Sequence, residues 1–264
     1  MEAVTEGQLS TGLPYLKLGQ GPPLVVASGL TSEHANPTGV WRRMSLSWVA
    51  PFAEHFTVYL VNRRARMAAG TSIADVAADY AGAIERDIGG PVLLHGTSLG
   101  GAVALQLAID RPELVQRLVV SASACRLSPH GLQVEAEVLR LIREGDGRRA
   151  SALLMEPGVP GHLAFAARGM GWLTGGGLAA DDKSDMVLMI AAEESFDAEP
   201  ELARIQARTL VLGGTDDRFY SEDLFRRTAA GIPDGQAVIL PGKSHLHVAG
   251  SKVTASIALG FLLG

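Results

Sequence analysis

Short aliphatic runs recur along the chain, each bounded by glycine, proline or polar residues. They cover residues 24–27, 57–61, 92–95, 118–121, 209–212 and 237–240. The runs are apolar throughout and do not alternate with polar residues, which is typical of strands buried on both faces of a parallel sheet.

Helical periodicity fills several of the segments between these runs. Ile73, Val76, Tyr80 and Ile84 recur at a spacing near 3.6 residues, while acidic residues occupy mainly the other side. Residues 99–109 predict another helix, which ends before a proline. The alternation of strands and helices predicts a doubly wound, mostly parallel α/β sheet.

The alternation stops after Ala124. From residue 126 to about 200 no strand pattern occurs, and helical patterns cover residues 132–143, 148–155, 163–172 and 182–194. A strand pattern resumes at Thr209, so we predict a core of residues 1–124 and 201–264 with a helical lid (cap) of residues 125–200 inserted between two strands. The segment "GWLTGGGLAADD" follows no strand, and we interpret it as a hinge of this lid.

Composition narrows the class of protein. Of 264 residues, 47% are hydrophobic and 19% charged, a balance typical of soluble globular proteins. The net charge of -5 provides no basic surface for nucleic acid. The single cysteine, Cys125, excludes an intrachain disulfide, and no apolar run approaches the length of a membrane span. The start of the chain carries no secretory signal pattern, so we expect a cytoplasmic protein, and its oligomeric state stays open.

The stretch "VLLHGTSLGGA" contains the most informative motif. It runs from an aliphatic strand through Gly96-Thr97-Ser98-Leu99-Gly100 into a predicted helix. A nucleophilic serine needs an exposed oxygen and a nearby base, and a sharp strand-to-helix turn exposes the oxygen but crowds the backbone. Glycines two residues before and after Ser98 would relieve that crowding. The alternative is a glycine-rich turn whose serine only caps the helix.

The motif in this context resembles the α/β-hydrolase family, in particular its lidded serine esterase branch, and the resemblance extends from about Leu13 to the end. It implies an α/β-hydrolase fold and a triad in the chain order nucleophile, acid, histidine. In "TLVLGGTDDRFYS" the family pattern selects Asp217 as the acid, with Asp216 as the alternative. In "AVILPGKSHLHVAG" it selects His245, with His247 as the alternative.

The resemblance also implies an oxyanion hole made of two backbone amides. One belongs to Leu99, directly after the nucleophile. The other would belong to Leu30, in the loop after the strand at residues 24–27, where Ser28-Gly29 replaces the His-Gly pair common in relatives. Of the other histidines, His95 is interpreted as structural. His34 near this loop and His162 in the lid are candidates for substrate contact.

Together these features predict a serine hydrolase that cleaves a carboxylic ester, lactone or thioester of a small hydrophobic substrate through an acyl-enzyme on Ser98. One alternative is a carbon–carbon bond hydrolase of a dienoic ring-cleavage product, which "DDRFY" resembles although the glycine-rich early loop of that group is missing. A catalytically silent ligand-binding protein is another. No metal or organic cofactor is expected. The lid residues expected to line a pocket over Ser98 are Leu139, Ile142, Leu153, Met155, Phe165, Met170, Trp172, Met186 and Met189.

Overall fold

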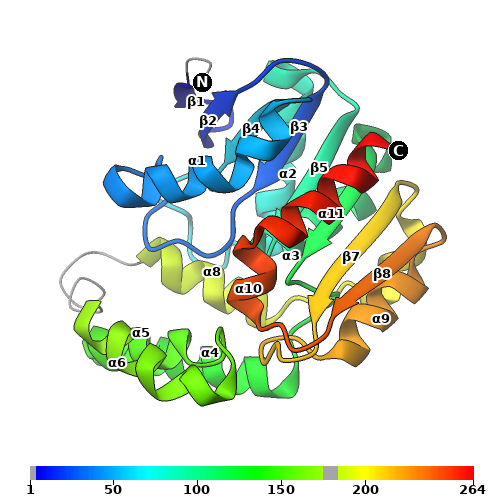
Figure 1. Ribbon diagram of the computed structural model, residues 1–264. Helices are drawn as coiled ribbons and strands as arrows, with labels where there is room; N and C mark the ends of the chain where they lie inside the picture. The colour runs from blue at the N-terminus through cyan, green and yellow to red at the C-terminus, as the bar shows by residue number, and fades with distance from the viewer. Residues whose placement is uncertain (1–3, 175–183) are drawn as a thin grey trace.

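The computed structural model describes residues 4–174 and 184–264 and contains an eight-stranded sheet (Figure 1). The strand order is β1-β2-β4-β3-β5-β6-β7-β8, and all pairings from β4 to β8 are parallel. The strands are β1 (Thr5–Gln8), β2 (Pro14–Leu18), β3 (Pro23–Ala27), β4 (Thr57–Val61), β5 (Val92–Thr97), β6 (Val115–Ser121), β7 (Arg208–Gly214) and β8 (Gly235–Leu240). The predicted fold class, an α/β-hydrolase fold with a mostly parallel sheet, is confirmed.

The sequence analysis did not predict two of the strands, β1 and β2. β1 and β2 form an antiparallel extension of the sheet, in which Tyr15 of β2 pairs with Val61 of β4. β1 is polar and largely exposed, and β2 buries Pro14 and Leu16 fully while its other residues are partly exposed. Neither strand therefore has the continuous apolar run that identified the central strands.

Helices cover both faces of the sheet (Figure 1). On one face, α1 (Gly39–Ala53) and α11 (Lys252–Leu263) pack against a cluster that includes Val49, Phe52 and Ala258. On the other, a larger cluster contains residues of α2 (Ile73–Ala83), α3 (Leu99–Asp110) and α9 (Glu222–Gly231). α2 continues into the π-helical turn Ile84–Ile88, and short 3-10 turns lie at Pro112–Leu114 and Glu199–Arg204.

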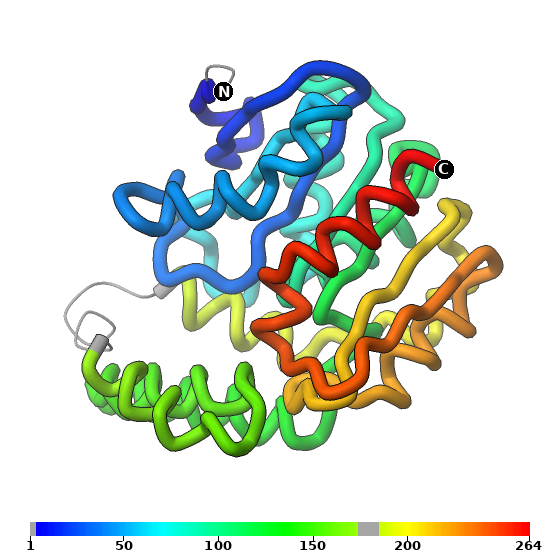
Figure 2. The backbone as a smooth tube through the Cα atoms, viewed as in Figure 1, coloured from blue at the N-terminus to red at the C-terminus, as the bar shows by residue number. Residues whose placement is uncertain are grey.

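A helical insertion separates β6 from β7 in the chain, although these strands are hydrogen-bonded neighbours. It contains α4 (Pro129–Arg143), α5 (Gly147–Met155), the 3-10 turn Gly161–Leu163, α6 (Ala164–Thr174) and α8 (Ser184–Glu194). These elements match the four predicted helical segments. Most of the predicted hinge, residues 175–182, lies outside the described residues. Figure 2 shows α4, α5 and α6 gathered at one end of the sheet, near the turn that leads into α10 (His245–Gly250).

Hydrogen bonds join the insertion to the core at several places, two of which involve the start of α8 and the start of α10. The carboxylate of Asp185, in the first turn of α8, accepts hydrogen bonds from the backbone amides of Arg66 and Met67, each at 2.7 Å. The carbonyl of Gly158 accepts a hydrogen bond of 2.9 Å from the amide of Leu246 in α10. Within the described ranges, no helix is both long enough and apolar enough to cross a membrane.

Candidate active site

Ser98 lies at the bend between β5 and α3, with φ 52° and ψ -129°. Positive φ is strained for any residue with a side chain. The chains around the bend approach closely, since a Cβ atom on Gly96 would lie 2.3 Å from the Gly100 carbonyl oxygen. A Cβ on Gly100 would lie 2.2 Å from the carbonyl oxygen of Ala27 in β3. The spacing of the two glycines around Ser98 therefore follows from this crowding.

The side chain of Ser98 does not cap α3, although Ser98 occupies the N-cap position. Of the five other N-cap serines among the described helices, Ser244 also makes no cap, but Ser72, Ser128, Ser221 and Ser251 each accept a hydrogen bond from a backbone amide of the helix that they precede. The Ser98 hydroxyl instead lies 3.1 Å from Nε2 of His245. This difference argues against the interpretation of Ser98 as a capping residue.

Asp217, His245 and Ser98 form one continuous hydrogen-bonded chain. Nδ1 of His245 lies 2.9 Å from Oδ2 of Asp217. An ionised carboxylate can only accept, so Nδ1 carries the proton and Nε2 is free to accept from the Ser98 hydroxyl. The alternatives, Asp216 and His247, are both exposed, and the Asp216 carboxylate accepts a bond from the neighbouring Thr215 hydroxyl.

The carboxylate of Asp217 is buried and held on both oxygens. Oδ1 accepts hydrogen bonds from the backbone amides of Phe219 at 2.9 Å and Tyr220 at 3.0 Å. Oδ2 faces the imidazole of His245. The loop after β7 therefore fixes the carboxylate in the orientation that the histidine requires.

A second acid acts on His245 from the helical insertion. Burial lowers the pKa of His245, but the charge and hydrogen bond of Asp217 and the charge of Glu193 in α8 outweigh burial and raise it. The carboxylate of Glu193 accepts a 2.7 Å hydrogen bond from the Tyr220 hydroxyl. The Tyr220 ring stacks on the imidazole at 5.9 Å between centroids. Glu193 and Tyr220 thus connect the insertion to the histidine.

Glu135 of α4 lies in the same buried region. Burial and the charges of Glu193 and Glu194 raise the pKa of Glu135 well above its ordinary value of 4.5. Its Oε2 has no hydrogen-bond partner among the described residues. Burial also raises the pKa of Glu193, but the hydrogen bond from Tyr220 and the charges of His245 and Arg63 oppose that rise, whereas the charges acting on Glu135 are all acidic. Glu135 is therefore the member of the pair that retains a proton.

The loop after β3, in which Leu30 lies, is held by Arg63. This arginine is 1% exposed and donates to the carbonyls of Ser28 at 2.8 Å and Gly29 at 3.0 Å. It also donates to the Thr31 hydroxyl at 2.9 Å. A peptide unit is planar and trans, so fixing the Gly29 carbonyl also fixes the Leu30 N–H in the opposite direction. The Leu99 amide, at the start of α3, is one of the four that a helix leaves without an intrahelical partner.

A family model described as "Alpha/beta hydrolase family" matches residues 24–255. The chain belongs to the alpha/beta hydrolase family. A relative from Pseudomonas savastanoi pv. phaseolicola, named "Putative carbamate hydrolase RutD", is 29% identical over 164 residues, covering 57% of this chain and 59% of that protein. A protein with the same name from Variovorax paradoxus is 29% identical over 194 residues, covering 69% and 70%. The first relative is therefore matched over about three fifths of its length.

Solved structures show the same fold as this alpha/beta hydrolase. The crystal structure of MGS-M2, an alpha/beta hydrolase enzyme from a Medee basin deep-sea metagenome library, has a TM-score of 0.82 and 14% identity and covers 96% of this chain and 94% of its own. The structure of a hydrolase from Pseudomonas aeruginosa PA01 has a TM-score of 0.76 and 22% identity, covering 100% and 99%.

The sequence analysis did not identify Arg63, Glu193 or Tyr220 as site residues of this alpha/beta hydrolase. Arg63 lies two residues after the end of β4, and the carboxyl ends of parallel strands are where ligand sites form, so its position was a usable signal. Glu193 follows an apolar helical stretch, and no local pattern connects it with a histidine 52 positions later.

His34 is buried, and burial and then the charge of Arg63 lower its pKa to about 4. His162 is exposed.

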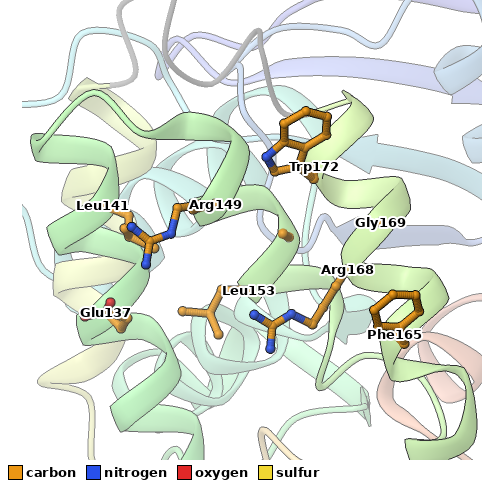
Figure 3. A pocket seen from close by; sticks show the side chains of 9 residues that line it. Glu137, Leu141, Arg149, Leu153, Phe165, Arg168, Gly169 and Trp172 are labelled. Atoms are coloured by element: carbon orange, nitrogen blue, oxygen red, sulfur yellow. The ribbon is translucent and has the colours of Figure 1, made fainter.

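The insertion of this alpha/beta hydrolase contains a cavity of its own, of about 350 Å³, between α4, α5 and α6 (Figure 3). Leu153, Phe165 and Trp172 line it, but Ser98, Asp217 and His245 do not. Leu139, Met186 and Met189 are buried in the main core cluster. The lid residues predicted to line one pocket over Ser98 are therefore divided between this cavity, which Ser98 does not line, and the core cluster. Among the described residues, no group of three or more His, Cys, Asp or Glu side chains is arranged to hold a metal ion.

Proposed function

We propose that this alpha/beta hydrolase is a serine hydrolase that cleaves a carboxylic ester of a small hydrophobic substrate through an acyl-enzyme on Ser98. The observation that carries the proposal is the 3.1 Å contact between the Ser98 hydroxyl and Nε2 of His245, whose other nitrogen is bound to Asp217. A serine hydroxyl becomes a nucleophile at neutral pH when a positioned base takes its proton. Ester, lactone and thioester substrates all fit this chemistry.

In the first step His245 takes the proton of Ser98 while Oγ forms a bond to the carbonyl carbon. The carbonyl π electrons move to the oxygen, which the amides of Leu30 and Leu99 stabilise by donating hydrogen bonds. One such donor is typically worth about 3 kcal/mol of the barrier. The buried charge of Asp217 stabilises the imidazolium that forms.

In the second step the imidazolium gives its proton to the oxygen of the leaving alcohol as the carbon–oxygen bond breaks. Water then attacks the acyl-enzyme, His245 takes a proton from that water, and the Ser98 ester bond breaks. The acid is released and Ser98 regains its proton. The helical insertion acts as the lid in this proposal, covering the side of the site where Tyr220 packs on His245.

Cleavage of a carbamate is a second candidate function. Its support is the sequence similarity to proteins named as carbamate hydrolases, at 26% to 29% identity. A carbamate also offers a carbonyl carbon to the serine, so the same three residues would serve. An ester carbonyl is the more reactive of the two toward a hydroxyl nucleophile, and esters are therefore the first substrates to test.

Labelling with a fluorophosphonate tests the proposed nucleophile. We expect a covalent adduct on Ser98 by peptide mass mapping, abolished in Ser98→Ala and slowed at least about 100-fold in His245→Ala. Ser251→Ala is the matched control, because Ser251 is also an N-cap serine but its side chain accepts from the Thr254 amide. That variant should lose about 1 kcal/mol of stability and label normally. A folded protein that remains unlabelled would contradict the proposal.

A substrate panel then separates the candidate functions. Nitrophenyl esters, an aryl carbamate and a dienoic ring-cleavage product should be compared in the wild type and in Ser98→Ala. We expect Ser98-dependent ester hydrolysis to have the largest kcat/KM. A larger value for the dienoic substrate would favour carbon–carbon bond cleavage, and labelling of Ser98 without turnover of any substrate would favour a ligand-binding protein.

A further inference from the structure

The loop that carries Asp217 is held by the helical insertion as well as by the core. The amide of Ser128, which precedes α4, donates a 2.9 Å hydrogen bond to the carbonyl of Phe219. Gly131, in the first turn of α4, packs so closely on this carbonyl that a Cβ atom on Gly131 would lie 2.5 Å from the oxygen. The start of α4 therefore fixes the backbone two residues after Asp217.

Tyr220, the next residue of this loop, makes three contacts. Its backbone amide donates a 3.0 Å hydrogen bond to Oδ1 of Asp217. Its ring lies at 20° to the plane of the His245 imidazole, with 5.9 Å between the centroids. Its hydroxyl donates a 2.7 Å hydrogen bond to Oε1 of Glu193 in α8. One residue therefore contacts the acid and the base of the proposed triad and also a helix of the insertion.

These contacts leave the Tyr220 ring no free torsion. A tyrosine side chain has two torsions that place its ring. The bond to Asp217 holds the backbone end of the residue, and the bond to Glu193 holds the hydroxyl at the far end. Tyr220 and Glu193 are both buried, so water does not replace the hydroxyl bond when it is lost. The tilt of the ring against His245 therefore depends on where α8 places Glu193.

The position of Glu193 depends in turn on how α8 lies on the core. The carboxylate of Asp185 binds the amides of Arg66 and Met67 at the first turn, and Met189 is buried in the main core cluster. Glu193 follows Asp185 by eight residues, about 12 Å along the helix axis. Because a helix moves as a stiff rod, a change at the Asp185 end also moves Glu193.

The contact that this arrangement protects tolerates little displacement. Nε2 of His245 lies 3.1 Å from the Ser98 hydroxyl, close to the upper end of the range of about 2.6–3.2 Å within which a base accepts a proton. A small tilt of the imidazole would break this contact while leaving Asp217 bound to Nδ1.

We propose that Tyr220 is a positioning residue: its hydroxyl, held by Glu193, keeps the His245 imidazole aligned between Asp217 and Ser98, so that proton transfer depends on the seating of α8 against the core. The inference rests on the proposed function, because it concerns the transfer of a proton from Ser98. It gives the insertion a part in the reaction beyond covering the site.

Tyr220→Phe tests the inference by removing the hydroxyl alone. The quantities to measure are the limiting rate constant of fluorophosphonate labelling at Ser98 and the reagent concentration that gives half that rate. We expect the rate constant to fall about tenfold and the concentration to stay within about twofold, because alignment is lost and binding is not. An unchanged rate constant in folded Tyr220→Phe, or a change in the concentration alone, would overturn the inference.

Tyr80→Phe is the matched control. Tyr80 and Tyr220 are both 2% exposed, but the Tyr80 hydroxyl donates its hydrogen bond, of 2.9 Å, to the carbonyl of Val61 in β4. The control variant therefore loses a buried hydroxyl bond without a change in the contacts of His245. We expect it to label at the wild-type rate, and a fall equal to that of Tyr220→Phe would overturn the positioning role.

Two variants of Glu193 separate the hydrogen bond from the charge. Glu193→Gln keeps an accepting oxygen, whereas Glu193→Leu removes it. At about pH 9, above the acidic limb of the pH profile, Glu193→Leu should lose about as much as Tyr220→Phe, and Glu193→Gln should stay within about threefold of the wild type. The double variant Glu193→Leu/Tyr220→Phe should lose no more than either single one, because both remove the same bond. Equal losses in the two Glu193 variants, or losses that multiply in the double variant, would overturn the inference.

Asp185→Ala tests the dependence on α8 at a distance from the triad. It removes both bonds that hold the first turn of α8, so we expect labelling to slow several-fold in the wild type and no further in Tyr220→Phe. Asp146→Ala is the control, because Asp146 accepts from the Arg149 amide at the start of α5. Labelling at the wild-type rate in Asp185→Ala would overturn the dependence on α8.

Failure of the inference and failure of the proposed function give different results. A labelled Ser98 with an unchanged rate in Tyr220→Phe leaves the proposed function intact and overturns only the positioning role, whereas an unlabelled Ser98 overturns the function. The NMR signal of the Nδ1 proton of His245 needs no reaction. We expect Tyr220→Phe to broaden it, because a less restrained imidazole exchanges this proton with water, and Tyr80→Phe to leave it sharp. Equal line widths would overturn the positioning role whether or not Ser98 is labelled.

Discussion

The most strained residue of the site is also the one with the most specific hydrogen bond. Ser98 keeps a positive φ because β5, buried along all six of its residues, and α3 hold the two ends of the turn. A conformation of this kind costs about 1–3 kcal/mol and persists only where the surroundings hold it in place. The same strain turns the hydroxyl away from the helix amides and toward His245.

The glycines around Ser98 allow a direct test of this crowding. Gly100→Ala would place a methyl group 2.2 Å from the Ala27 carbonyl oxygen, so we expect a loss of about 1–3 kcal/mol in the free energy of unfolding and a loss of activity. Gly260→Ala in α11 is the matched control, because nothing lies within 4 Å of its added Cβ. That variant should gain about 0.5–1 kcal/mol. Urea unfolding measures both values, and equal effects would contradict the argument.

The charge of Glu193 should appear in the pH dependence of the reaction. A general base must be neutral, so kcat/KM falls as the pH drops through the pKa of His245. Since Glu193 raises that pKa, Glu193→Gln should move the acidic limb of the pH profile to lower pH. Rates for a nitrophenyl ester between about pH 5 and 9 measure the shift. Glu194→Gln, the adjacent acid, is the control that should leave the limb in place; an unmoved limb in Glu193→Gln would show that Glu193 carries no charge.

At the scale of elements, the contact between α4 and α8 is the unusual one, because it buries two acids. Glu135 comes from α4 and Glu193 from α8, and both are almost fully buried. The Glu193 carboxylate accepts a hydrogen bond from the Tyr220 hydroxyl, while Oε2 of Glu135 has no hydrogen-bond partner among the described residues. Such a pair is stable only while one member keeps its proton.

The stability of this helix contact should therefore depend on pH. The pKa of Glu135 is raised in the folded chain, so above its ordinary value of 4.5 the unfolded chain releases the proton first and the native state loses stability as the pH rises. Glu135→Gln removes this loss, and its Tm relative to wild type should increase from about pH 5 to pH 8.

Glu137→Gln on the same helix is the control for this prediction. Hydrogen bonds from Arg140 lower the pKa of Glu137, so its contribution to stability has the opposite sign and is already present above pH 4.5. Its Tm relative to wild type should therefore not rise between the two pH values. A parallel rise in both variants would refute the assignment of the buried proton to Glu135.

At the scale of the whole molecule, the sheet and the insertion are built differently. The central strands lie between two hydrophobic clusters. α5 and α6 pack mainly on each other, and α5 also packs on α4, while Phe165 and Leu173 of α6 are 90% and 70% exposed. Little apolar surface ties these two helices to the sheet, which is a condition for local opening.

Hydrogen exchange should separate these two parts of the molecule. Amides of β5 and β6 should exchange only on global unfolding, and those of α5 and α6 should exchange faster, through local opening. Exchange measured by mass spectrometry under native conditions, with and without low urea, distinguishes the two regimes. Equal protection of α6 and β5 would contradict the expectation.

The central strands, the helical insertion and the Ser98 turn were predictable because each leaves a local signature. A strand buried on both faces needs a continuous apolar run, and a crowded turn needs glycines at fixed offsets. The same reasoning did not predict β1 and β2, because these two strands are short, partly exposed and antiparallel. It also did not identify α1.

The sequence by itself determined the fold class and the residue types available for chemistry, since periodicity and turn composition depend only on neighbouring residues. Only the tertiary structure decided that Arg63 holds the loop of Leu30, that Glu193 acts on His245 and that Tyr220 contacts both. These relations join residues far apart in the chain. They depend on the strand order and on helix packing, which bring the groups into contact.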